Sequence, residues 1–150
     1  MTKRFLLTGF ITTIINLLLN AIAYAFVLKD FYHSHPAGTE EFMNQLHRKP
    51  DQLIVWAMVA TSVAMGYLIT LIMKWSGAKT FLSGLKYGSI VGFLFWGSVN
   101  FGIYASSNVF SQAGMFVDLI CSGTSMTIAA AFAAWMLNKG QKLGEIKISE

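Results

Sequence analysis

The sequence predicts an all-α integral membrane protein, a bundle of four transmembrane helices. Of its 150 residues, 55% are hydrophobic and 12% are charged, whereas about 25% of the residues in an ordinary soluble domain are charged. The charged residues cluster at the ends of apolar runs. Four of these runs are close to the ~20 residues that a helix needs to cross the hydrocarbon core. We therefore expect one membrane domain that covers residues 1–150.

The first predicted helix covers residues 5–28 (FLLTGFITTIINLLLNAIAYAFVL) and is preceded by Lys3 and Arg4. Its apolar run is longer than the 7–15 residues of a signal-peptide core, so we expect a helix that is retained. The second predicted helix covers residues 53–73 and is followed by Lys74. Basic residues in these places suit the headgroup region at the ends of a membrane helix.

The loop between these two helices, residues 29–52, is the longer one and contains a predicted short interfacial helix. The candidate stretch is GTEEFMNQLHRKP, with Thr39 as a suitable N-cap and Glu40 and Glu41 in the first turn of the helix. Its apolar residues would face the membrane. Pro50 marks where this segment stops.

The third predicted helix covers residues 81–105 and the fourth covers residues 114–137. Because the turn between them is short, we expect them to be antiparallel neighbours. On the third helix, Gly84, Gly88 and Gly92 form a G-x-x-x-G-x-x-x-G series. Glycines at this spacing make a flat groove in which another helix can approach closely. We expect the partner to be the first or second helix of the same chain, with a second copy of the chain as the alternative.

The distribution of lysine and arginine predicts the orientation in the membrane. Eight basic residues lie before the first helix, between the second and third, or after the fourth, and three lie in the first loop. This asymmetry predicts that both termini are cytoplasmic, in a multi-pass protein of the bacterial inner membrane. Because the basic residues flank apolar segments and form no stripe, they indicate contact with membrane lipid and argue against nucleic-acid binding. The eight are Lys3, Arg4, Lys74, Lys79, Lys86, Lys139, Lys142 and Lys147, and the three are Lys29, Arg48 and Lys49.

Polar side chains recur at one-turn spacing inside the predicted spans, and residues four apart share a helix face. They predict an intramembrane polar cluster toward the non-cytoplasmic side. We expect Asn100 to face the bundle and to meet Asn16, Asn20 or Asp118. Two roles stay open, because such side chains can fix helix register through interhelical hydrogen bonds or line a small polar cavity. The predicted cluster comprises Asn16, Asn20, Tyr24, Asn100, Tyr104, Asp118 and Ser122.

Asp118 has two interpretations. It lies about one turn inside the predicted start of the fourth helix, where an acid complements the positive end of the helix macrodipole. The alternative is an intramembrane proton or cation site, which is the default hypothesis for an ionisable residue within a span. Its position near the predicted end of the helix favours the first interpretation.

The first loop carries three histidines, His33, His35 and His47. A His-x-His pair with a third imidazole can hold zinc or copper, so these residues are the candidate metal ligands. Loop histidines are more often simply solvated. The chain has neither a P-loop nor a G-x-S-x-G motif, and nothing in it identifies an enzyme or a cofactor. The single cysteine, Cys121, cannot form an internal disulfide and suits a small buried hydrophobe.

The stretches GLKYGSIVGFLFWGSVNFGIYASSN and FVDLICSGTSMTIAAAFAAW resemble two uncharacterised families of small four-helix bacterial membrane proteins, DUF1761 and DUF2177. These families carry a glycine-rich third helix, a Tyr/Asn pair near its end and an Asp that opens the fourth helix. The chain departs from the DUF2177 pattern at Cys121 and Ser122, where an aromatic residue and a glycine are expected. The resemblance implies the fold and implies no activity. The matching residues are Gly88, Gly92, Tyr104, Asn108 and Asp118.

Three classes of function follow from these patterns. The first is a small-solute or ion transporter or channel subunit, which would work as a homo-oligomer because four helices enclose little aqueous volume. The second is an accessory or scaffold subunit of a membrane complex. The third is metal or ligand binding by the loop histidines at the outer face. In the first class, the path would be lined by Asn16, Asn20, Asn100 and Asp118.

Overall fold

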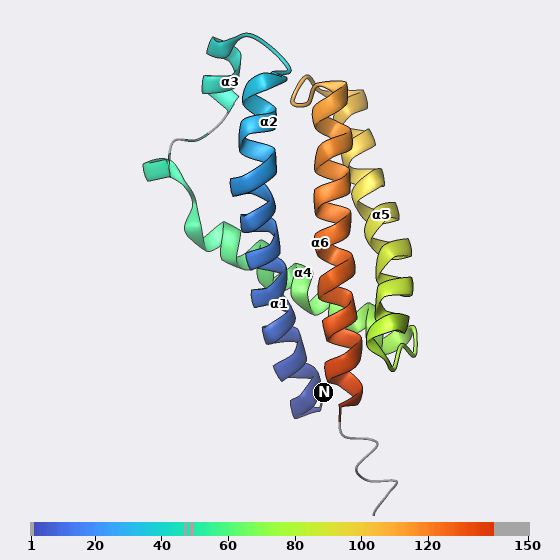
Figure 1. The fold of residues 1–150 in the computed structure, drawn as a ribbon. Coiled ribbons are helices and arrows are strands. Elements are labelled where there is room, and N and C mark those ends of the chain that lie inside the picture. The colour runs from blue at the N-terminus through green and yellow to red at the C-terminus, as the bar shows by residue number, and fades with distance from the viewer. Residues whose placement is uncertain (1, 47, 49, 140–150) are drawn as a thin grey trace, which may run out of the picture.

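The computed structural model describes residues 2–46, 48 and 50–139, and this part of the chain is all-α (Figure 1). Four of its helices are long and apolar enough to cross a membrane, which confirms the predicted fold class. The first of these helices is continuous over Lys3–Ser34. It comprises α1 (Lys3–Ala23), a π-helical turn (Tyr24–Leu28) and α2 (Lys29–Ser34), and the other long helices are α4 (Val55–Trp75), α5 (Phe81–Ser106) and α6 (Gln112–Asn138).

The predicted spans agree with these helices in order and type, but the first helix runs on to Ser34, beyond the predicted limit at residue 28. The loop that follows holds α3 (Glu40–Leu46), over the stretch for which the sequence predicts a short helix, and a 3-10 turn at Pro50–Gln52. The backbone N–H of Phe42 donates to the Thr39 hydroxyl at 3.3 Å, as an N-cap does.

Side chains cap the two helices that form the C-terminal hairpin. At the start of α5, Thr80 and Ser83 form a capping box, in which each side chain binds the backbone N–H of the other residue. At the start of α6, the Ser111 hydroxyl accepts a hydrogen bond from the backbone N–H of Gly114 at 3.1 Å. The turn from α4 to α5 uses Gly77, whose φ of 68° suits glycine. These local signals set where the helices begin.

Helix α6 is the centre of the bundle, because it packs against α1, α4 and α5. Small residues make this possible: Ala129, Ala130, Ala131, Ala133 and Ala134 are all buried. Larger core side chains come from the neighbours, with Ile69 and Met73 on α4 packed into the same cluster. A helix with small side chains on several faces lets three partners approach it at once.

The glycine series of α5 packs against α6, so the sequence-based assignment of its partner to the first or second helix is wrong. An added Cβ at Gly84 would lie 2.6 Å from the Cα of Ala131, and one at Gly88 would lie 2.6 Å from the Cβ of Ala130. At Gly92 it would lie 3.0 Å from the backbone oxygen of Gly123. The glycines show that a helix approaches closely, but their spacing does not say which helix it is.

Helix α4 follows an oblique course behind α1 and α6 (Figure 1). Its second half is buried at Gly66, Ile69, Thr70 and Met73. Its first half leaves the bundle, so that Trp56 is 75% exposed. Close contact with α1 fixes the crossing, because an added Cβ at Gly66 would collide with Thr13.

The N-terminus lies at the same end of the bundle as the end of α6 (Figure 1), where Arg4 donates to the backbone oxygen of Lys139 at 2.6 Å. We call this the basic end, because six described basic residues gather there. The opposite end, with the loop around α3, carries Asp30, Glu40, Glu41 and Asp51, and we call it the acidic end. The six basic residues are Lys3, Arg4, Lys74, Lys79, Lys86 and Lys139.

We predict that Gly84→Leu destabilises the protein, whereas Gly102→Leu does not. The Gly84 variant forces a side chain onto the α6 backbone, and overpacking costs about 1–3 kcal/mol or more. Gly102 is the matched control on the same helix, because an added Cβ there meets no atom within 4 Å. The apparent Tm of the detergent-solubilised protein should fall by about 2–4 °C per kcal/mol for the first variant alone. Equal behaviour of the two variants would contradict the described α5–α6 contact.

Candidate functional site

In the described residues, no hydrogen bond joins the side chains of the predicted polar cluster to one another. Asn16, Asn100 and Ser122 are buried, and Asn20 and Asp118 are partly buried. Tyr24 and Tyr104 are exposed, with 55% and 42% of their surface accessible. The two tyrosine side chains are therefore largely exposed at the outside of the bundle, unlike the buried members of the set.

Several polar side chains inside the long helices donate to the backbone of their own helix. The Asn100 amide donates to the backbone oxygen of Trp96 at 3.0 Å, and the Asn20 amide donates to that of Asn16 at 2.8 Å. Neither amide bonds to another helix in the described part of the chain, so the expected contact of Asn100 with Asn16, Asn20 or Asp118 is not a hydrogen bond. The carbonyl one turn earlier is the nearest acceptor when no water is present. Thr13, Ser62, Thr70 and Thr127 donate in the same way.

The outward position of Tyr24 has a geometric cause. Steps of four residues drift by ~40° around an α-helix of 3.6 residues per turn, so a series that begins at Thr12 has left its face by Tyr24. The π-helical turn Tyr24–Leu28 then accommodates one more residue than an α-helical turn, which rotates the chain back by ~100°. As a result Leu28 is only 7% exposed. The same rotation brings Tyr32, one turn later, toward α6.

Tyr32 and Asp118 form the one hydrogen bond between two side chains that joins two of the long helices in the described residues. The Tyr32 hydroxyl donates to Asp118 Oδ1 at 2.9 Å. The tyrosine ring packs against Gly114, where an added Cβ would lie at an ordinary contact distance of 3.4 Å from it. Close by, the Ser111 hydroxyl donates to the backbone oxygen of His35 at 2.9 Å. These contacts hold the end of α2 against the start of α6.

The sequence did not identify Tyr32 as the partner of Asp118. Its signal was that of an aromatic residue near a predicted membrane interface, and the two residues are 86 positions apart. What connects them is the length of the first helix together with the π-helical turn. Predicting the contact from the sequence would have required both the helix length and the π-helical turn. No residue pattern in the sequence indicates the π-helical turn.

The position of Asp118 within α6 weakens the helix-dipole interpretation. Helix α6 begins at Gln112, so Asp118 is its seventh residue and no acidic residue lies in the first turn. Dipole effects fall off within the first turn of a helix. The carboxylate therefore lies deeper than the sequence predicted, and its side chain faces α2 and is partly buried.

Two buried polar atoms lack a hydrogen-bond partner in the described part of the chain, Thr12 Oγ1 and Asn100 Oδ1. Thr12 is 0% exposed and Asn100 is 1% exposed. An unpaired buried acceptor is costly, and it commonly marks a place where a water molecule or an ion binds. Asn100 lies on α5, one residue before Phe101, whose ring contacts that of Phe116 on α6. It is thus within about one helical turn of the depth of Asp118.

The candidate metal ligands are not assembled in the described residues. His33 and His35 are exposed at the end of α2, and the His35 ring stacks on Phe31 with ring centroids 4.3 Å apart. The described residues contain no group of three or more His, Cys, Asp or Glu side chains that can hold a metal ion. His47 lies outside the described residues, so the three-histidine site stays a prediction.

The helices and their composition define a small polytopic membrane protein with four candidate transmembrane helices. No family model matches the chain, and no curated protein or solved structure is significantly similar to it. The resemblance to the DUF1761 and DUF2177 families therefore stays a prediction from the sequence.

We predict that deleting Ala25 is tolerated and that inserting one alanine after Ala25 is not. Deletion turns the π-helical turn into an α-helical one and leaves Leu28 buried and Tyr32 facing α6. Insertion rotates α2 by a further ~100° and separates Tyr32 from Asp118.

The apparent Tm in detergent should stay within about 2 °C for the deletion and fall by more than about 4 °C for the insertion. The two variants control for each other, because a regular α-helix would suffer comparably from either change. Equal losses would show that the extra residue is not accommodated at this turn.

Proposed function

We propose that this protein is a small transport or channel subunit in which Asp118 binds and releases a proton or a small cation. The observation that carries the proposal is the Tyr32–Asp118 hydrogen bond of 2.9 Å. Asp118 is the only acidic residue within the predicted spans. An ionisable side chain at that depth, turned toward another helix, is costly to keep unless it has a function.

The carboxylate of Asp118 is held but not saturated. Tyr32 supplies one donor to Oδ1, and Oδ2 accepts no hydrogen bond from the described residues. A carboxylate bound on every side would be a structural anchor. A carboxylate with one free oxygen can take a proton or contribute to the oxygen ligands of a cation. The phenol fixes the orientation of the group while the free oxygen exchanges its ligand.

Polar groups continue from Asp118 toward the middle of the bundle. Ser122 and Ser125 follow at the next turns of α6 and are 6% and 5% exposed. On α1, Asn16 is 7% exposed and Thr12 is 0% exposed with its hydroxyl unpaired. The two helices that carry these residues, α1 and α6, pack against each other. Hydroxyl and amide groups that lack protein partners suit water molecules, which a proton relay needs.

The proposal includes a location and an orientation. The six described basic residues at the basic end favour a cytoplasmic position for that end, in the bacterial inner membrane. Asp118 then faces the outer side. Because the described helices pack closely around α6, we further propose that a homo-oligomer forms the complete path.

We predict that Asp118→Asn abolishes flux, lowering it by at least about tenfold, as removal of the exchanging group should. The protein is reconstituted in vesicles that contain a pH-sensitive dye, and a proton, sodium or potassium gradient is applied. Tyr32→Phe should reduce the flux without abolishing it, because the carboxylate remains. Asp51→Asn, at the same end of the protein, is the control and should leave the flux unchanged.

Wild-type flux in the Asp118→Asn vesicles would refute the transport proposal, and so would absence of flux from the wild-type protein. Circular dichroism and a single peak on size exclusion must show that each variant is folded. With those controls, a loss of flux reports on the carboxylate and not on the amount of protein.

A second candidate function, a subunit of a larger membrane complex, is favoured by the first half of α4. This half leaves the bundle (Figure 1), and most of its described residues are exposed. Trp56 and Val55 are 75% and 65% exposed, and Val59 is 54% exposed. Aromatic and branched side chains that form one exposed face can pack against a helix of another subunit.

We predict for this second candidate that replacing Trp56 and Val59 by alanine lowers the mass of the particle purified in mild detergent. Native mass spectrometry gives that mass and identifies any subunit that is lost. Leu94→Ala is the matched control, because Leu94 is 70% exposed on α5, away from α4. An unchanged mass in the double variant, or an equal change in the control, would contradict a subunit contact at α4.

A further inference from the structure

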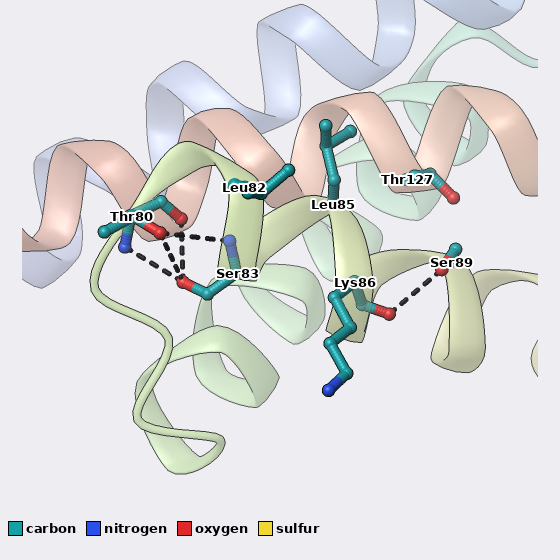
Figure 2. Close-up of a pocket in the computed structure, with 7 residues that line it drawn as sticks. All are labelled: Thr80, Leu82, Ser83, Leu85, Lys86, Ser89 and Thr127. Carbon is teal, nitrogen blue, oxygen red and sulfur yellow. Dashed lines mark hydrogen bonds between the residues drawn. The ribbon is translucent and has the colours of Figure 1, made fainter.

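The basic end of the bundle carries an open groove of about 650 Å³ between α5 and α6 (Figure 2). Leu82, Leu85 and the aliphatic part of Lys86 line it from α5, and Thr127 lines it from α6. Figure 2 shows Leu82 and Leu85 on the side of α5 that faces α6, while the Lys86 ammonium extends away from α6. The groove therefore combines an apolar wall with one positive charge at its rim.

The hydroxyl groups along the groove are already engaged. Ser83 takes part in the capping box with Thr80, and the Ser89 hydroxyl donates to the backbone oxygen of Lys86 at 2.9 Å. The Thr127 hydroxyl donates to the backbone oxygen of Gly123 at 2.8 Å. A free phosphate ion binds where several unpaired donors converge, and this groove offers none besides Lys86. Its chemistry suits an amphipathic ligand with one anionic group.

Lys86 has no counter-ion within the described residues. Four of the described acidic residues lie at the acidic end, and the fifth, Asp118, lies in the part of α6 that is near the acidic end and far from Lys86. Two other lysines of the basic end have aromatic partners: Lys74 lies 5.5 Å from the centroid of the Phe5 ring, and Lys139 lies 4.4 Å from that of Trp135. A lysine within a membrane helix extends its ammonium toward the headgroups and needs an anion there.

We propose that the α5–α6 groove at the basic end binds one anionic glycerophospholipid. The Lys86 ammonium pairs with the lipid phosphate, and the acyl chain lies along Leu82 and Leu85 toward Thr127. The dimensions agree, because Ser89 lies ~12 Å along α5 from Phe81, about the depth of the upper part of an acyl chain. Charge complementarity selects an anionic lipid over a zwitterionic one. This proposal does not depend on the transport proposal.

The test is native mass spectrometry of the purified full-length protein with added phosphatidylglycerol or phosphatidylcholine of identical acyl chains. The wild type should retain one phosphatidylglycerol about fivefold more tightly than phosphatidylcholine, the factor that corresponds to about 1 kcal/mol per lysine. Lys86→Gln should remove this preference, and Lys86→Arg should restore it. Lys29→Gln, at the acidic end, is the matched control and should retain the preference.

Ser89→Leu tests the apolar groove independently of the charge, because the larger side chain fills the groove while Lys86 is unchanged. Retention of phosphatidylglycerol should fall in this variant as well. Millimolar inorganic phosphate should not displace the lipid. Equal retention of the two lipids by the wild type, retention unchanged by Lys86→Gln, or displacement by phosphate would each overturn the proposal. Circular dichroism confirms that the variants are folded, and the exposed position of Lys86 makes its substitution safe for the fold.

Discussion

Hydrocarbon offers no hydrogen bonds, and this constraint accounts for most of the polar geometry of the protein. Asn20, Asn100 and four hydroxyl side chains return their hydrogen to the carbonyl one turn earlier on the same helix. Such bonds satisfy the side chain without any help from a neighbour, so they leave helix association to packing. The side chains that donate in this way therefore contribute little to helix association, although their pattern in the sequence suggests interhelical hydrogen bonds. The polar groups that are not bonded in this way are the ones to examine for function.

Association depends instead on how closely the backbones approach. The glycine series of α5 and the alanines of α6 bring these two helices into contact over most of their length, and α6 then offers its other faces to α1 and α4. Against this tightly packed background, an atom without a partner is conspicuous. Three polar groups in the described residues still have unused hydrogen-bonding capacity. They are the acceptor of Asn100, the hydroxyl of Thr12 and the carboxylate of Asp118, which accepts one hydrogen bond. They locate where function is to be sought.

Composition alone determined the number of helices and their approximate limits, because a membrane helix is encoded by a local run of apolar residues. The arrangement of the helices was beyond its reach. Gly84 indicates a close neighbour without identifying it, and the outward position of Tyr24 follows from the drift of a four-residue spacing along an α-helix. The partnership of Tyr32 with Asp118 arises from two segments 86 residues apart. It depends on the extra turns of the first helix beyond the predicted span, whose polar sequence suggested a loop.

The helices differ in length, and the difference has a mechanical consequence for the bilayer. The helix Lys3–Ser34 has 32 residues and extends ~48 Å, whereas α4 has 21 residues and extends ~31 Å. Because α4 also lies obliquely to the first helix (Figure 1), it covers less than its full length along the axis of that helix. In a bilayer whose normal follows the first helix, the lipids beside α4 would have to thin to match it. That thinning would fall on one flank of the molecule, and thin patches of membrane or neighbours that share the deformation would relieve it.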